Sequence, residues 1–175
     1  MIRKLSLLLS LLPLGCATYS YNGLAPGKAT IDEVMGVMGA PSLQWDLPDG
    51  AVQLAYPRGP IGVHTYMVHL DSGKRLVRVE NVLTPRVFAS IVQGMDTEAV
   101  LRSLGPPVPH WTVYFERRDE LVWEWRYCDE WRQYARFSVL FDGTTGKVRS
   151  TLSLTESQIG LCGGRFSTGS CWCAP

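Results

Sequence analysis

The chain has 175 residues and a formal net charge of +1, a length that suits one domain or two small ones. The near-zero net charge disfavours a general nucleic-acid binder, which carries a strong basic excess. After the N-terminus, no stretch is apolar over the roughly 20 residues that a transmembrane helix needs.

The N-terminal segment, residues 1–16, has the pattern of a secretory signal. Two basic residues precede a leucine-rich run, Leu5–Leu14. This run is too short to remain as a transmembrane helix. Cys16 follows a small residue at its end, which resembles a lipobox, where the thiol is acylated and becomes the new N-terminus. We therefore expect cleavage before Cys16 and lipidation of this residue.

The lipobox departs from the usual pattern, because Pro13 stands three places before the Cys where an aliphatic residue is common. The alternative is ordinary secretory cleavage after Ala17, since residues 15–17 also form a small-x-small site. Acyl chains on Cys16 would hold the protein to a leaflet, because each buried methylene contributes about 0.8 kcal/mol. Ala17, in place of Asp, resembles outer-membrane sorting in enteric bacteria. We expect a lipid-anchored protein of the outer membrane that faces the periplasm.

A short helix with its caps is predicted at Thr30–Pro41 and again, 66 residues later, at Asp96–Pro107. Each segment begins with a residue whose side-chain oxygen can accept from unpaired backbone N–H groups, and Glu33 completes a capping box in the first copy. Apolar residues then recur with helical spacing. Gly39 and Gly105 supply left-handed C-caps, and the prolines that follow end each helix.

Strand-like runs follow each helix. In Leu121–Tyr127 the apolar side chains occupy alternate positions, as in a half-buried antiparallel strand. Phe137–Phe141 is the next predicted strand, and Asp142 begins its turn. Leu54–Tyr56 and Val68–Leu70 are the corresponding runs of the first copy.

The repeat predicts an α+β fold of two tandem modules, each a short helical segment packed on a small antiparallel β-sheet. A last strand, at Leu76–Val79 or Val148–Leu154, completes each module. The modules extend over residues 22–83 and 88–155. Residues 156–175 form a Cys-rich C-terminal tail.

Four cysteines follow Cys16, namely Cys128, Cys162, Cys171 and Cys173. An even number in an exported chain favours disulfides. A Cys171–Cys173 bridge would close a strained loop, so we prefer pairings that join Cys128 to one of these two and Cys162 to the other. The alternative is a zinc site of four thiols, which an oxidising periplasm disfavours.

The second copy carries Gly94-Met95-Asp96, a helix that ends at Leu104-Gly105-Pro106-Pro107, and the strand motif Trp123-Glu124-Trp125. This pattern resembles the BamE/SmpA/OmlA small lipoprotein domain. The first copy matches less closely, because Gly27 stands one residue early and two residues replace a single Met.

The resemblance implies a helical start followed by a three-stranded antiparallel sheet. Members of that family are outer-membrane lipoproteins, and the best known is an accessory part of the machine that inserts β-barrels. That subunit has one module, whereas this chain has two. The beta-lactamase inhibitory proteins are similar in fold and also join two modules, which form one concave binding surface.

Residues suited to catalysis are not arranged as known motifs require, because the sequence has no nucleophile elbow, P-loop or zinc-protease signature. His64 and His69 are five residues apart and fall on opposite strand faces, which disfavours a metal site. Glu120 and Glu124 share an exposed strand face and are better explained as solvated charges than as an acid/base pair. We expect no enzyme activity, catalytic residue, metal or cofactor.

An aromatic and arginine-rich stretch of the second module is the best indication of a binding surface. Trp, Tyr and Arg dominate the hot spots of protein interfaces. The two tryptophans of the strand motif are assigned to the core. Trp131, Arg132 and Tyr134 lie in a polar loop where nothing forces burial. We predict protein-binding roles for these three residues and for Trp111.

The sequence therefore predicts an envelope lipoprotein that acts as a protein-binding or scaffolding module, accessory to outer-membrane assembly or integrity. Its partner is expected to be another envelope protein, and nucleic acid is not expected. The alternative is an inhibitor-like binding module for an envelope or secreted enzyme.

Labelling with radioactive palmitate tests the lipid anchor. Wild-type protein is expected to incorporate the label and a Cys16→Ala variant to incorporate none, because both cleavage and acylation require this thiol. Equal labelling of the two chains would contradict the anchor.

Overall fold

The computed structural model of the chain describes residue 21, residues 23–59 and 61–162, and residues 171–173. The signal segment and the predicted lipidation residue, Cys16, lie outside the described residues. Within the described part, no helix is both long and apolar enough to span a bilayer.

The first half of the chain forms one helix and a four-stranded antiparallel sheet in the order β1-β2-β3-β4. Its elements are α1 (Ile31–Met38), β1 (Leu43–Asp46), β2 (Val52–Pro57), β3 (Thr65–Leu70) and β4 (Leu76–Asn81).

The second half forms another four-stranded antiparallel sheet in the order β5-β6-β7-β8. Its elements are α2 (Pro85–Phe88), α3 (Thr97–Leu104), η1 (Pro109–Trp111), β5 (Val113–Phe115), η2 (Glu116–Arg118), β6 (Glu120–Cys128), β7 (Tyr134–Asp142) and β8 (Val148–Thr155).

The structure thus contains two modules of α+β type, as the repeat predicts at this level. Each sheet has four strands, whereas the family resemblance implies three. The added strands are β1 and β5, short elements that the alternation of apolar residues does not reveal. The two sheets are also separate hydrogen-bonded units, so they do not form one continuous sheet.

The predicted N-caps are present in both copies. The Thr30 hydroxyl accepts from the Glu33 N–H at 3.3 Å, and the Glu33 carboxylate accepts from the Thr30 N–H at 2.7 Å. In α3, the Asp96 carboxylate accepts from the Ala99 N–H at 2.8 Å. Gly39 and Gly105 end the two helices as predicted, with positive φ of 81° and 72°. Their ψ values of −169° and −170° are extended, so the expected left-handed helical conformation was wrong.

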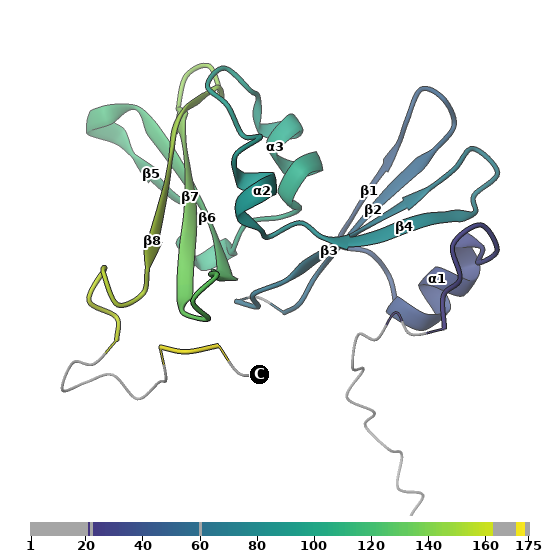
Figure 1. Cartoon of the computed structure of the whole chain (residues 1–175). Coiled ribbons are helices and arrows are strands. Elements are labelled where there is room, and N and C mark those ends of the chain that lie inside the picture. Colours follow the sequence, from purple (N-terminus) through teal and green to yellow (C-terminus); the bar gives the residue numbers. More distant parts are fainter. Residues whose placement is uncertain (1–20, 22, 60, 163–170, 174–175) are drawn as a thin grey trace, which may run out of the picture.

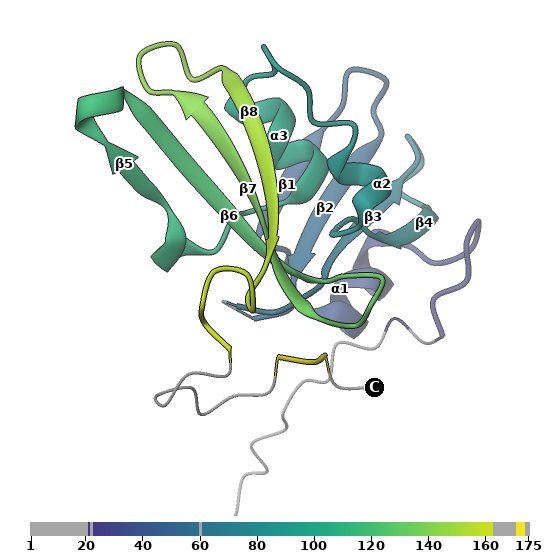
Figure 2. The same ribbon diagram turned by 60° about the vertical axis from the view of Figure 1, so that its left-hand side comes forward.

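The buried residues form two clusters. In one, Val34 and Met38 of α1 lie with apolar residues of β2, β3 and β4. In the other, Val100 and Leu104 of α3 lie with residues of both sheets. Figures 1 and 2 show α2 and α3 between the sheets, and Figure 1 shows α1 on the far side of the first sheet.

Strand β2 reflects this arrangement, because its residues from Val52 to Tyr56 are all buried. Burial on both faces is unusual for a strand that contains a polar residue. The exception, Gln53, donates through Nε2 to the Arg102 carbonyl at 2.6 Å. That carbonyl lies in the last turn of α3, where backbone acceptors lack partners within the helix. The bond therefore ties the first sheet to the helix of the second module.

The two C-cap glycines provide a matched test of the contact between α3 and the first sheet. A Cβ on Gly105 would lie 2.7 Å from Thr65 Cγ2, whereas a Cβ on Gly39 would meet nothing within 4 Å. Gly39→Ala is expected to cost about 1–2 kcal/mol through its positive φ alone. Gly105→Ala should cost roughly 1–3 kcal/mol more through overpacking. Chemical denaturation measures both.

Thr65→Ser removes the clashing methyl group and serves as the control. In a double-mutant cycle it is expected to bring the cost of Gly105→Ala down to that of Gly39→Ala. Equal costs for the two glycine variants in the wild-type background would contradict a tight contact.

Candidate functional site

The two faces of the second sheet differ sharply. On the inner face, Trp125, Phe137 and Phe141 belong to the cluster that includes α3. Because side chains alternate along a strand, the residues between them project to the outer face. No α-helix among the described residues lies over this outer face, which is at the left of Figure 1. It is therefore the sheet face that is open to a partner.

Charged residues form a connected network on the outer face. Arg126 makes a two-pronged pair with Glu156, with distances of 2.9 Å from Nε to Oε1 and 2.7 Å from Nη2 to Oε2. Arg136 Nη1 lies 3.2 Å from Glu124 Oε2, and Ser138 donates to Glu124 Oε1 at 2.9 Å. Such bidentate pairs fix both position and orientation.

Two aromatic rings hold these arginines in place. The Arg126 guanidinium carbon lies 3.7 Å from the centre of the Tyr134 ring, and that of Arg136 lies 3.6 Å from the centre of the Trp111 ring. Cations stacked on aromatic faces are attracted by the ring quadrupole. As a result, both arginine side chains are less than a fifth exposed although they lie on an open sheet face.

Apolar side chains lie on the same outer face. Leu152 of β8 is paired with Ser138, and Val113 of β5 is paired with Val122, so each pair shares a face. Leu152 is 48 % exposed and Val113 is 42 % exposed. The outer face thus combines ordered Arg and aromatic side chains, both enriched at protein interfaces, with accessible apolar area.

The four predicted binding residues divide into two groups. Trp111 in η1 and Tyr134 in β7 stack under arginines of the outer face. Tyr134 is half-buried and begins a strand, so its placement in an open loop was wrong. Trp131 and Arg132 lie in the turn between β6 and β7, and Trp131 is 77 % exposed. The sequence could not identify Arg126 and Arg136, because only the sheet register brings them over the rings.

The two disulfides are Cys128–Cys173 and Cys162–Cys171. They confirm the preference for pairings that separate the two neighbouring tail cysteines. The tail also pairs with the β6–β7 turn, since the Tyr134 N–H donates to the Cys171 carbonyl at 2.9 Å and the Cys173 N–H to the Arg132 carbonyl at 2.7 Å. The described end of the tail is therefore fastened beside the outer face.

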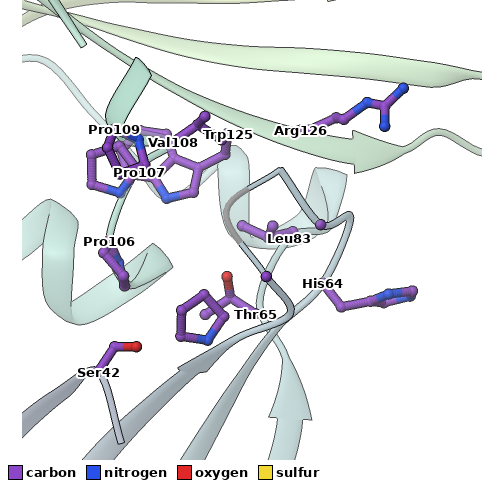
Figure 3. Close-up of a pocket in the computed structure, with 13 residues that line it drawn as sticks. Ser42, His64, Thr65, Leu83, Pro106, Pro107, Val108, Pro109, Trp125 and Arg126 are labelled. Atoms are coloured by element: carbon purple, nitrogen blue, oxygen red, sulfur yellow. The ribbon is translucent and has the colours of Figure 1, made fainter. Parts of the chain in front are cut away.

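A cleft lies between the two sheets. This inter-sheet cleft has a volume of about 460 Å³ and is mostly apolar, with Thr65 and Leu83 on one side and Val108 and Trp125 on the other (Figure 3). His64 lies at its edge. Partial burial lowers the pKa of His64, and the positive charge of Arg58 lowers it further.

The remaining ionisable candidates are paired. His69 Nε2 lies 3.1 Å from Glu80, far along β3 from the cleft where His64 lies. Glu120 pairs with Arg118 at 2.8 Å. Glu120 and Glu124 are both partly buried, and each forms an ion pair with an arginine. The expectation that they are solvated charges was therefore wrong. In the described part of the chain, no three His, Cys, Asp or Glu side chains are grouped to hold a metal.

No protein-family model, curated protein or solved structure matches this chain. The site is therefore interpreted from its own geometry.

Replacing Glu156 tests how strongly the charge network stabilises the sheet. Glu156→Ala leaves Arg126 and Arg136 partly buried without their shared carboxylate, and we expect a loss of roughly 3 kcal/mol. Glu98→Ala is the matched control, because the Glu98–Arg102 pair is about half exposed and should contribute less than about 0.5 kcal/mol. Urea denaturation compares the variants, and equal losses would contradict a stabilising network.

Proposed function

We propose that this protein is an envelope lipoprotein, anchored through Cys16, that binds another envelope protein through the outer face of its second sheet. The observation that carries the proposal is the combination on that face of ordered Arg–Glu pairs and exposed apolar side chains. We also propose that the chain consists of two copies of one module, residues 22–83 and 88–155, each with its helix packed on its sheet.

The order of the outer face favours binding over simple solvation. A long Arg side chain loses rotamer freedom when a partner immobilises it, which opposes association. Arg126 and Arg136 are already held by carboxylates and by the rings of Tyr134 and Trp111. The rotamer entropy of these two side chains is therefore already lost on folding, so a partner that contacts the outer face loses little more of it on binding.

The disulfides support an envelope location. Disulfides persist in oxidising compartments such as the periplasm and are rare in the cytosol. Here Cys128–Cys173 fastens the described end of the tail to the end of β6, and Cys162–Cys171 joins two positions within the tail. The presence of two disulfides agrees with an exported chain, whether the lipid is anchored in the inner or the outer membrane.

The separation of the two sheets favours scaffolding over inhibition. The inhibitor-like alternative relies on two modules that join into one concave surface. In this chain α2 and α3 lie between the sheets, and each sheet has its own set of four strands (Figure 1). The surface open to a partner is the outer face of one sheet.

Site-specific photo-crosslinking tests the proposed surface. A photoreactive amino acid at Leu152, on the outer face, is expected to give a discrete adduct with an envelope protein in intact cells. The matched control is Val37 of α1, which is similarly exposed at 44 % but lies on the opposite side of the molecule. That position should give no such adduct.

The identity of the adduct separates the two functional classes. A membrane-associated envelope protein would support the scaffold, whereas a soluble secreted hydrolase would support the inhibitor. Adducts of equal yield from both positions, or none from Leu152, would contradict the outer face as the binding surface.

A further inference from the structure

One end of the second sheet carries exposed apolar side chains that the proposed binding face does not explain. We call this cluster the apolar tip, and it consists of Trp131, Ile159, Leu161 and Trp172. Trp131 is 77 % exposed and Trp172 is 58 % exposed, whereas the other tryptophans of the chain are buried or half-buried. Large exposed apolar side chains that lie together mark a site of interaction.

The β6–β7 turn holds Trp131 in a fixed position. The Asp129 carboxylate accepts from the Trp131 N–H at 3.0 Å and from the Gln133 N–H at 2.7 Å. The Arg132 N–H donates to the Asp129 carbonyl at 3.0 Å. The backbone that carries the exposed indole is therefore ordered before anything binds to it, which reduces the entropy that binding costs.

The tail brings the other apolar side chains to the same end. Trp172 forms an antiparallel bridge with Gln133, and the neighbouring Cys173 is joined to Cys128 at the end of β6. In the turn after β8, the Leu161 N–H donates to the Glu156 carbonyl at 2.8 Å. The apolar tip is thus one surface assembled from three segments.

The start of the described chain lies at this end of the molecule as well. The Tyr21 ring lies 5.4 Å from that of Tyr66, near the start of β3. The adjacent Thr65 lines the inter-sheet cleft together with Arg126, which is two residues from the end of β6. Figures 1 and 2 both show the start of the described chain, the β6–β7 turn and the tail at the lower side of the molecule.

The position of the proposed anchor restricts what the apolar tip can meet. Tyr21 follows Cys16 by five residues, and five residues span at most about 17 Å when fully extended. Lipid on Cys16 would therefore keep this end of the molecule close to the bilayer. Such a short tether gives the tip a high effective concentration at the lipid surface.

The side chains of the tip suit the layer between lipid headgroups and acyl chains. Tryptophan is enriched at this layer, because its ring is apolar and its N–H is polar. Glu130 and Arg132 stand on either side of Trp131 and are exposed. These charges can remain among the headgroups while the indole enters the interface. Binding of this kind increases with the apolar area that is buried.

We propose that the apolar tip docks on the bilayer surface that holds the lipid of Cys16, with Trp131 and Trp172 in the interfacial layer. This inference rests on the lipid anchor of the proposed function and goes beyond it, because it assigns a second contact with the membrane. The tip lies at the ends of strands, so docking leaves the outer face at the side of the molecule. A neighbouring envelope protein can then reach that face.

Fluorescence quenching by brominated lipid tests the docking. The lipidated full chain is reconstituted in vesicles of phosphatidylethanolamine and phosphatidylglycerol whose acyl chains carry bromine close to the headgroup. The wild-type protein should float with the vesicles, and the bromine should quench its tryptophan fluorescence. Bromine near the bilayer centre should quench it less, because tryptophan is expected at the interface. The Trp131→Phe/Trp172→Phe double variant should float equally and lose most of the quenching.

Two single tryptophans provide the matched control, each added to this double variant. Leu161 in the tip is 47 % exposed and Val92 is 56 % exposed. Val92 lies at the opposite end of the second sheet, since the nearby Gly94 N–H donates to the carbonyl of Val148, where β8 begins. Leu161→Trp should restore the quenching, whereas Val92→Trp should float with the vesicles and remain unquenched.

The two measurements separate this inference from the proposed function. Flotation with equal quenching at Leu161→Trp and Val92→Trp, or with none at either, would overturn the docking and leave the anchor intact. A wild-type chain that does not float would contradict the anchor on Cys16 and overturn the docking with it.

Discussion

The packing of α3 between the two sheets is the constraint on which the rest of the structure depends. A helix of eight residues is far too short to be stable alone in water, and an apolar sheet face must be covered by another layer. Val100 and Leu104 meet both requirements at once, because they share one buried cluster with residues of both sheets. The two halves of the chain are consequently parts of one packed unit.

This shared helix makes the repeated halves unequal. Strand β2 of the first sheet is buried along both faces: Val52, Leu54 and Tyr56 share a cluster with residues of α1, and Ala55 shares the other cluster with residues of α3. The second sheet is covered on its inner face, and its outer face keeps exposed residues such as Leu152. The two halves therefore present different surfaces: the open sheet face belongs to the second half, and the cleft is lined by residues of both.

The polar chemistry follows the same division. Where a polar residue is enclosed between layers, as Gln53 is, it bonds directly to a helix carbonyl. Where charged residues lie on the open face, aromatic rings and paired carboxylates shelter them, as Tyr134 and Glu156 shelter Arg126. These charged side chains are thus partly buried although no second layer covers them, and their contacts hold them in fixed positions on the open face.

Much of the local structure was determined by the sequence alone, since helix caps, glycine stops and alternating strands depend on residues close together in the chain. Thr30, Asp96, Gly39 and Gly105 illustrate this, as do the strands at β6 and β7. The tertiary structure alone decided that the outer face of the second sheet stays open and which arginine meets which ring. The short strands β1 and β5 and the shared position of α3 belong to the same class. These features depend on contacts between residues far apart in sequence, which no local pattern encodes.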